Sequence, residues 1–144
     1  MRRWGEAMER GRVYRRRPGA YAILWRRGEL LLTFQAEPHP EVQLPGGGID
    51  PGESPLGALH REVLEETGWT ISGARRLGVY KRYAYMPDYD LWAEKVCQVW
   101  LARPVRRVGP PTEPGHAALW ASPEVALDLL PNAGERDFLR KLLT

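Results

Sequence analysis

The segment from Ser54 to Gly68 carries the clearest helix signals in the chain. Ser54 can accept hydrogen bonds from free backbone N–H groups as an N-cap, and Pro55 suits the first helical position. Gly68 suits the position just beyond the helix end. The preceding segment, 38–53, contains prolines and a run of glycines, and both break helices. The sequence therefore predicts a helix over residues 55–66 that follows an irregular, non-helical segment.

Two extended regions flank this helix. The apolar runs Ala20–Arg26 and Glu29–Gln35 are joined by Arg27-Gly28, which is typical of a β-hairpin with a short turn. After the helix, Ile71–Tyr85 is predicted to be extended and interrupted.

The C-terminal half adds a long strand, a loop and two short helices. Residues 92–102 alternate with period two, which predicts a strand, although Lys95 interrupts its mostly apolar face. Prolines make 104–115 a predicted loop, and after it we expect a strand over His116–Ala121, a helix from Ser122-Pro123-Glu124 to about Leu130, and a helix over Glu135–Leu143. This order of elements predicts an α/β (α+β) fold in which a mixed β-sheet is sandwiched between helices.

The composition is that of one ordinary globular domain. The chain has 144 residues, of which 43% are hydrophobic and 27% are charged. The longest apolar stretch, Ala20–Trp25, is far shorter than the roughly 20 residues of a membrane span. Cys97 is the single cysteine, which excludes an internal disulfide or a multi-cysteine metal site. Because it lies on the apolar face of a predicted strand, we expect it to be a small core residue. We expect a cytoplasmic protein, a monomer or homodimer, without a membrane partner.

Charge is concentrated at the N-terminus. Residues 1–17 hold seven Arg and two Glu. We expect this stretch to be a basic, poorly ordered arm, with a single domain over 18–144. The alternative is that the arm attracts phosphate-rich ligands or RNA. RNA is not favoured as a partner, because the arm contains no recognised nucleic-acid-binding module.

Acidic residues cluster at the end of the predicted helix. Glu62, Glu65 and Glu66 share one side of the helix, and the apolar side is predicted to hold Leu56, Leu59, His60, Val63 and Leu64. Each carboxylate in the last turn opposes the helix dipole at a cost of about 0.3–1 kcal/mol, and Arg61 cannot neutralise all three. A hard divalent cation would stabilise the cluster. A solvated acidic face is the alternative.

The same helix lies within a recognisable pattern. The stretch from Gly47 to Trp69 resembles the Nudix box, which is Gly, five residues, Glu, seven residues, then Arg-Glu-apolar-any-Glu-Glu-any-Gly-apolar. The identities are Gly47, Glu53, Arg61, Glu62, Glu65, Glu66 and Gly68. Leu44-Pro45-Gly46 also fits the family's usual lead-in. Trp69 departs from the pattern, because the closing apolar residue of the family is usually aliphatic.

The resemblance implies an enzyme that hydrolyses the pyrophosphate bond of a nucleoside diphosphate linked to another moiety, with Mg²⁺ or Mn²⁺ as cofactor. By the family pattern, Glu62, Glu65 and Glu66 would hold the metals, with the Gly46 carbonyl as a further ligand. Either Glu62 or Glu65 would act as the catalytic base on the attacking water. A nucleoside triphosphate, nucleotide sugar or dinucleoside polyphosphate would be the small-molecule substrate.

The resemblance also assigns roles beside the metal ligands. Arg61 and Glu53 are expected to act as a pair that fixes the loop to the helix. Gly47 and Gly48 are expected to let the backbone approach phosphates closely. A carboxylate outside the box often helps in this family, and we take Glu113 as the first candidate and Glu94 as the second. His116, in the same region as Glu113, either contacts phosphate or is structural.

Substrate choice must come from residues outside the box. Tyr83, Tyr85 and Tyr89 are the candidates for stacking on a base, although core packing is the commoner role of such rings. Two alternatives stay open: a non-catalytic nucleotide-binding or regulatory module on the same fold, and an RNA 5′-end pyrophosphohydrolase. Residues 43–46, Gln-Leu-Pro-Gly, do not match the lead-in expected for the latter.

Overall fold

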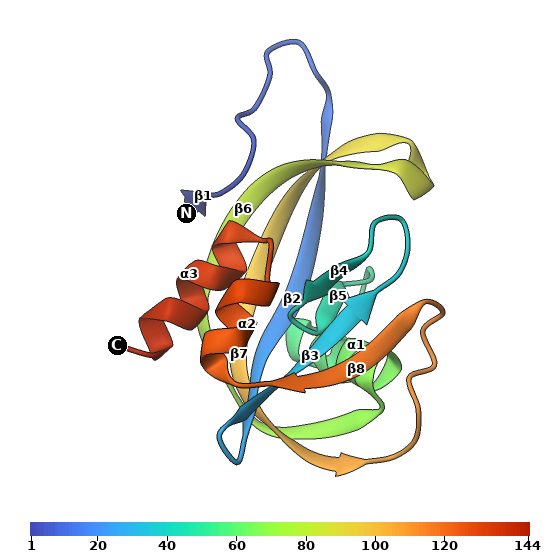
Figure 1. The fold of residues 1–144 in the computed structure, drawn as a ribbon. Helices are drawn as coiled ribbons and strands as arrows, with labels where there is room; N and C mark the ends of the chain where they lie inside the picture. Colours follow the sequence, from blue (N-terminus) through green and yellow to red (C-terminus); the bar gives the residue numbers. More distant parts are fainter.

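The computed structural model describes residues 1–144, and its strands form one mixed sheet of eight strands (Figure 1). Its strands are β1 (Arg2–Arg3), β2 (Tyr14–Arg26), β3 (Glu29–Gln35), β4 (Glu41–Gln43), β5 (Gly46–Gly48), β6 (Trp69–Met86), β7 (Leu91–Arg107) and β8 (His116–Ala121). The helices are α1 (Pro55–Thr67), α2 (Pro123–Leu129) and α3 (Ala133–Leu142), and a 3-10 turn, η1 (Pro87–Tyr89), joins β6 to β7.

The strand order is β1-β6-β7-β2-β3-β4, with β5 added to β2 and β8 added to β3. The β1–β6 and β2–β7 pairs are parallel, and the other pairs are antiparallel. Because both strand directions occur in one sheet, the predicted mixed sheet is confirmed.

The sheet buries a hydrophobic layer on each face. Ala20, Ala22 and Leu24 of β2 join a cluster with Leu59 and Val63 of α1. A second cluster combines residues of the long strands with residues of α2 and α3, among them Ile23, Leu130 and Leu139. Successive residues of a strand point to opposite faces, so β2 serves both layers. The sheet is therefore sandwiched between α1 on one side and α2 with α3 on the other, as predicted (Figure 1).

The predicted hairpin and the interrupted strand are both present. β2 and β3 pair in antiparallel register up to Arg26 and Glu29, and Arg27 and Gly28 both have positive φ, at 51° and 82°. Positive φ at both central residues defines a type I′ hairpin turn. β6 pairs with β7 through three register shifts between Trp69 and Gly78, which explains the broken sequence pattern.

The N-terminal residues differ from the expected arm. Residues 14–17 begin β2 and pair in parallel with residues 92–95 of β7, while Arg2 and Arg3 pair with β6. Five of the seven arginines of this stretch thus lie on β1 and β2, while Arg10 and Arg12 lie in the segment between these strands. Charge alone did not indicate this, because the strand that receives them lies far away in the sequence.

The buried side of α1 also differs from the prediction. Leu59 and Val63 are buried, but Leu56 and Leu64 are 40% and 39% exposed, and His60 is exposed. The residues buried in their place are Ala58, Glu66 and Thr67. The physical reason is that α1 contacts β5 and β8 as well as β2, so its acidic side is partly covered.

Two strand boundaries depart from the sequence analysis. The non-helical segment 38–53 contains the short strands β4 and β5. β7 continues to Arg107, through the start of the predicted loop, and Pro104 pairs with Ile71 of β6. Beyond Ala102 β7 has only β6 as a neighbour, and a strand with one open edge tolerates proline. No helix in the structure combines the length and apolar character needed to cross a membrane.

Candidate active site

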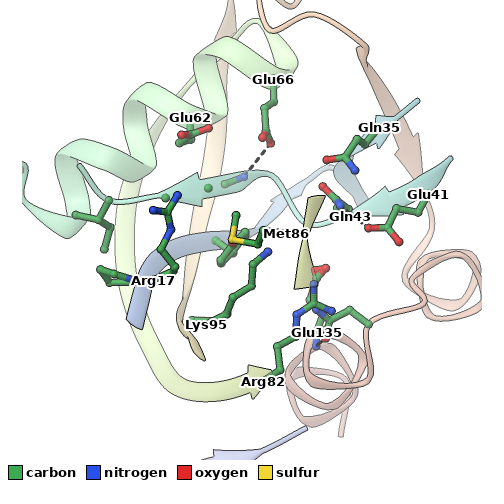
Figure 2. A pocket seen from close by; sticks show the side chains of 18 of the residues that line it. Arg17, Gln35, Glu41, Gln43, Glu62, Glu66, Arg82, Met86, Lys95 and Glu135 are labelled. Carbon is green, nitrogen blue, oxygen red and sulfur yellow. Dashed lines mark hydrogen bonds between the residues drawn. The ribbon is translucent and has the colours of Figure 1, made fainter. Parts of the chain in front are cut away.

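β5 brings the backbone of its glycines against α1. Gly46 has φ +148°, and a side chain there would collide with the carbonyl oxygen of Ala20. Its N–H donates to Oε1 of Glu66 at 3.0 Å, the bond drawn in Figure 2. The first glycine of β5 is therefore required by close packing, and it fixes the carboxylate of Glu66.

Gly47 makes room for a second carboxylate. A Cβ at Gly47 would lie 2.6 Å from the carboxyl carbon of Glu62, whereas a Cβ at Gly48 would meet no atom within 4 Å. The carbonyl of Gly48 accepts a hydrogen bond from Nη2 of Arg61 at 3.1 Å. In this structure Gly47 thus admits the Glu62 side chain to the strand surface, a packing role that the sequence analysis did not assign to it.

Arg61 connects the loop to the acidic end of the helix. Its guanidinium donates to both carboxylate oxygens of Glu53, at 2.7 and 2.9 Å. Nη1 donates to Glu62 at 3.0 Å and to Glu65 at 3.3 Å. The hydrogen bonds from Arg61 and from the Asp50 N–H lower the pKa of Glu53 to about 2. This geometry is the loop-to-helix pairing that the resemblance implied.

Glu66 is the most deeply placed carboxylate of the three, 6% exposed. Burial raises its pKa well above the ordinary value, and the Gly46 hydrogen bond opposes this rise. Burial also raises the pKa of Glu62, against the effect of Arg61. Nε2 of His116 lies 4.0 Å from Oε2 of Glu66, and the other ring nitrogen hydrogen-bonds the hydroxyl of Thr33 at 2.9 Å. His116 therefore lies beside Glu66 at the site.

The proline-rich loop is attached to the end of α1 by main-chain hydrogen bonds. The carbonyl of Glu65 accepts from the N–H groups of Thr112 and Glu113 at 2.8 and 2.9 Å, and the carbonyl of Gly68 accepts from Val108 at 2.7 Å. This attachment brings Glu113 to the pocket wall together with Glu62 and Glu66.

Glu94, the second candidate for an additional carboxylate, lies elsewhere. Its carboxylate accepts a hydrogen bond from the hydroxyl of Tyr83, and it does not line the pocket. Of the two carboxylates considered outside the box, the fold therefore brings only Glu113 to the site.

Glu62, Glu66, Glu113, His116 and the glycines of β5 form one wall of a large pocket with a volume of about 770 Å³ (Figure 2). Glu53, Arg61 and Glu65 do not line it. The other walls come from β2, the end of β3, β4, β6, β7 and the start of α3. Their polar and aromatic residues were not singled out as site residues in the sequence: Arg17, Tyr21, Gln35, Glu41, Gln43, Tyr80, Arg82, Lys95, Asn132 and Glu135. Two of them gave a signal in the sequence: Lys95 as the charged residue that interrupts an apolar strand face, and Arg17 as part of the basic N-terminal stretch.

The three candidate tyrosines do not lie together. Tyr89 lines the pocket, but Tyr83 and Tyr85 do not. Tyr83 is buried against Tyr14, and the hydroxyl of Tyr85 donates to Asp90. Tyr83 and Tyr85 thus lie outside the pocket to which we expected them to contribute, because alternate residues of β6 point to opposite faces and the pocket face carries the even-numbered residues.

The donor set fits a hard metal ion. The side chains of Glu62, Glu65, Glu66 and Glu113 supply only oxygen, the donor that Mg²⁺ and Mn²⁺ prefer. Buried Glu66 has no Lys or Arg nitrogen within 4.0 Å, so its charge lacks a close cationic partner. In this structure no three of these side chains lie close enough together to bind one metal ion. Arg61 instead forms hydrogen bonds with the carboxylates of Glu62 and Glu65.

A comparison with protein families gives a match to the NUDIX domain over residues 15–142. The chain belongs to the NUDIX family. The match covers the acidic helix end, β5 and the pocket walls, so the box and the site lie in one domain of this family. Enzymes of the NUDIX family generally use divalent metals.

Solved NUDIX structures share the fold. The MutT NUDIX hydrolase from Burkholderia pseudomallei superimposes with a TM-score of 0.69 at 28% identity and covers 88% of this chain and 97% of its own. A NUDIX hydrolase from Nitrosomonas europaea gives a TM-score of 0.69 at 20% identity, over 88% of this chain and 87% of its own. These likenesses confirm the expected fold class.

Curated relatives match over shorter stretches. A Bacillus subtilis protein named provisionally as an 8-oxo-dGTP diphosphatase is 36% identical over 51% of this chain and 50% of its own. An RNA pyrophosphohydrolase from Cereibacter sphaeroides is 37% identical over 58% of this chain and 51% of its own. The aligned stretch thus spans about half the length of these relatives, and their names point to different substrates.

Proposed function

We propose that this NUDIX chain is a Mg²⁺- or Mn²⁺-dependent hydrolase of the pyrophosphate bond in a nucleoside diphosphate linked to another moiety. The observation that carries the proposal is the convergence of Glu62, Glu66 and Glu113 on one wall of the pocket, beside the backbone of β5. Carboxylates in this arrangement would bind a divalent cation, and the cation would in turn bind an anionic diphosphate. Nucleoside triphosphates, nucleotide sugars and dinucleoside polyphosphates are the proposed substrates, in the cytoplasm.

Glu62, Glu65 and Glu66 would hold the metal, with the Gly46 carbonyl and Glu113 as further ligands. When bound, a divalent ion would supply positive charge that offsets the charge of the diphosphate and would make a nearby water more acidic. Either Glu62 or Glu65 would accept the proton of the attacking water. The water oxygen adds to one phosphorus of the diphosphate, while the bond from that phosphorus to the bridging oxygen breaks and the other phosphate leaves with that oxygen.

The remaining residues of the box position these carboxylates. Arg61 spans Glu53 on the loop and the helix carboxylates, so it holds the two parts of the site at a fixed separation. The N–H of Gly46 holds one oxygen of Glu66, which leaves the other oxygen for a ligand. Preorganised groups of this kind lower the cost of reaching the transition state.

RNA with a 5′-triphosphate is a second candidate substrate, because Arg16 and Arg17 line the pocket and the Cereibacter sphaeroides relative is named an RNA pyrophosphohydrolase. The alternative of a non-catalytic nucleotide-binding module is disfavoured, because the chain retains every carboxylate of the box. A hydrolysis screen over nucleoside triphosphates, nucleotide sugars, dinucleoside polyphosphates and triphosphorylated RNA, with each metal, separates these alternatives.

The proposal is tested by removing single charges at the helix end. Glu65→Gln and Glu66→Gln keep the shape of the side chain, and each should lower kcat by roughly 10²-fold on the best substrate. Glu94→Gln is the control, because this carboxylate lies outside the pocket and its loss should leave kcat unchanged. Mg²⁺ should also raise the melting temperature of the wild type more than that of either variant. Full turnover in both variants would contradict the assignment.

A further inference from the structure

Three cationic side chains form a row across the pocket face of the sheet. Lys95 of β7 is the register partner of Arg17 on β2 and of Arg82 on β6. All three line the pocket, and Figure 2 shows the Lys95 side chain extending into it. Register partners share one face of a sheet with their Cβ atoms about 5 Å apart. We call Arg17, Lys95 and Arg82 the cation row.

The row has no counter-charge in contact with it. No carboxylate oxygen lies within 4.0 Å of any of the three cationic groups. Arg17 lies over the ring of Tyr89, at 4.6 Å from its centroid, and Lys95 and Arg82 have no such contact. Burial, and then the charge of Arg82, lower the pKa of Lys95. Like charges opposite each other on neighbouring strands destabilise a sheet, so the row lowers the stability of the sheet, and the contact of Arg17 with the Tyr89 ring offsets only part of this.

The two acids nearest in the pocket are engaged elsewhere. Glu41 accepts a hydrogen bond from Gln43 at 2.6 Å. Both carboxylate oxygens of Glu135 accept the N–H of Leu44, at 3.2 Å each. Burial raises the pKa of Glu135 to about 8, so this side chain is mostly uncharged at neutral pH. The pocket wall around the row therefore carries an excess of positive charge.

We propose that the cation row binds a phosphate group of the substrate that is separate from the diphosphate cleaved beside α1. The inference rests on the proposed function, which places the diphosphate at the carboxylates. The row projects from strands β2, β7 and β6, on a different wall from Glu62 and Glu66 (Figure 2). Two guanidinium groups and an ammonium group suit the charge and the several oxygens of a phosphate. The chain would thus select substrates that carry a phosphate beyond the diphosphate.

The test compares pairs of substrates of which one member carries a phosphate beyond the diphosphate or triphosphate and the other lacks it. Coenzyme A and 3′-dephospho-coenzyme A are one pair, NADPH and NADH a second, and triphosphorylated ApA and ATP a third. The three pairs separate a 3′-phosphate, a 2′-phosphate and a phosphodiester as the source. The wild type should show a kcat/KM tenfold to a hundredfold higher for the phosphate-bearing member of at least one pair, the range expected for charge-assisted hydrogen bonds.

Lys95→Met and Arg82→Met should remove this preference, mainly by raising KM for the phosphate-bearing substrate. The kcat/KM for the other member of the pair should stay unchanged. Lys81→Met is the matched control, because Lys81 is next to Arg82 on β6 but lies over Tyr83 on the opposite face. Each row variant should be at least as stable as the wild type, because a like charge is removed, and a melting curve checks this. An equal fall in kcat/KM for both members of a pair would mean that the row contacts the diphosphate itself, and it would overturn the proposal.

A binding measurement separates this inference from the proposed function. In calorimetric titrations without metal, the wild type should bind adenosine 3′,5′-bisphosphate or its 2′,5′ isomer at least tenfold more tightly than AMP, and Lys95→Met should abolish the difference. Equal affinity for all three nucleotides in the wild type would refute the row as a phosphate site. A wild type that shows this preference in binding, but hydrolyses no member of any pair and no substrate of the screen described above with either metal, would refute the proposed function alone.

Discussion

Replacement of Glu135 by Gln should stabilise the protein increasingly as the pH rises. The Glu135 carboxyl group is 4% exposed, and its pKa is raised from 4.5 to about 8, chiefly by burial. Between these two values the folded chain keeps a proton that the unfolded chain releases. The free energy of unfolding of the wild type therefore falls as the pH rises through this window, whereas a Gln side chain does not titrate.

The size of the effect follows from the shift. Each pKa unit corresponds to about 1.4 kcal/mol, so the cost of Glu135 is about 3 kcal/mol at pH 7 and about 5 kcal/mol well above pH 8. Near pH 5 it is below about 1 kcal/mol. The amide retains one oxygen to accept the Leu44 N–H, and any change in that hydrogen bond adds a constant offset. The stability gap between variant and wild type should therefore widen by about 4 kcal/mol from pH 5 to pH 9.

Urea unfolding of both proteins at pH 5, 7 and 9 measures this gap, with the slope of the transition checked for constancy. Glu124→Gln is the control, because Glu124 is an exposed acid on α2 and its replacement should have only a small effect. Stability profiles of Glu135→Gln and wild type that run parallel over the whole range would show that burial does not hold the proton on Glu135.

Two further predictions concern the pocket. Gly47→Ala should lower kcat by tenfold or more, because the added Cβ would lie 2.6 Å from the carboxyl carbon of Glu62, which we propose to be catalytic. Gly48→Ala, where the Cβ meets nothing within 4 Å, should keep wild-type turnover, and equal kcat values for the two variants would contradict this. Tyr89→Ala should lower kcat/KM for the best nucleotide substrate by roughly tenfold if its ring stacks on a base, while Tyr85→Ala, outside the pocket, should not; substrate kinetics beside melting curves check both, and the reverse order would refute the placement.

Local signals predicted most of the elements and the acidic part of the site. Ser54, Pro55 and Gly68 mark the ends of α1. Their effect comes from the hydrogen bonding and conformation of the helix's own main chain, so it does not depend on the rest of the fold. The carboxylates of the last turn were identified because their spacing is fixed within one helix. Arg61 and Glu53 were paired from the resemblance alone, and the structure brings them into contact.

The remainder of the pocket depends on pairings between distant strands. Arg82 and Lys95 face each other only because β6 and β7 pair in one particular register, and a shift by one residue would turn each of them to the other face. The same register turns Tyr83 and Tyr85 away from the pocket. Alternation within a single strand gives two faces but does not tell which of them lines a cavity.

The attachment of the proline-rich loop to α1 has a consequence for engineering. Thr112, Glu113 and Val108 hold the helix end with backbone N–H groups only, so the bonds do not depend on which side chains the loop carries. A reporter group or a different ligand residue at position 113 would lie at the pocket wall, as the native carboxylate does. The side chain at position 113 can therefore be replaced without loss of the bonds that hold the loop. Gly68 cannot be replaced, because a Cβ there would collide with the carbonyl oxygen of Gly109.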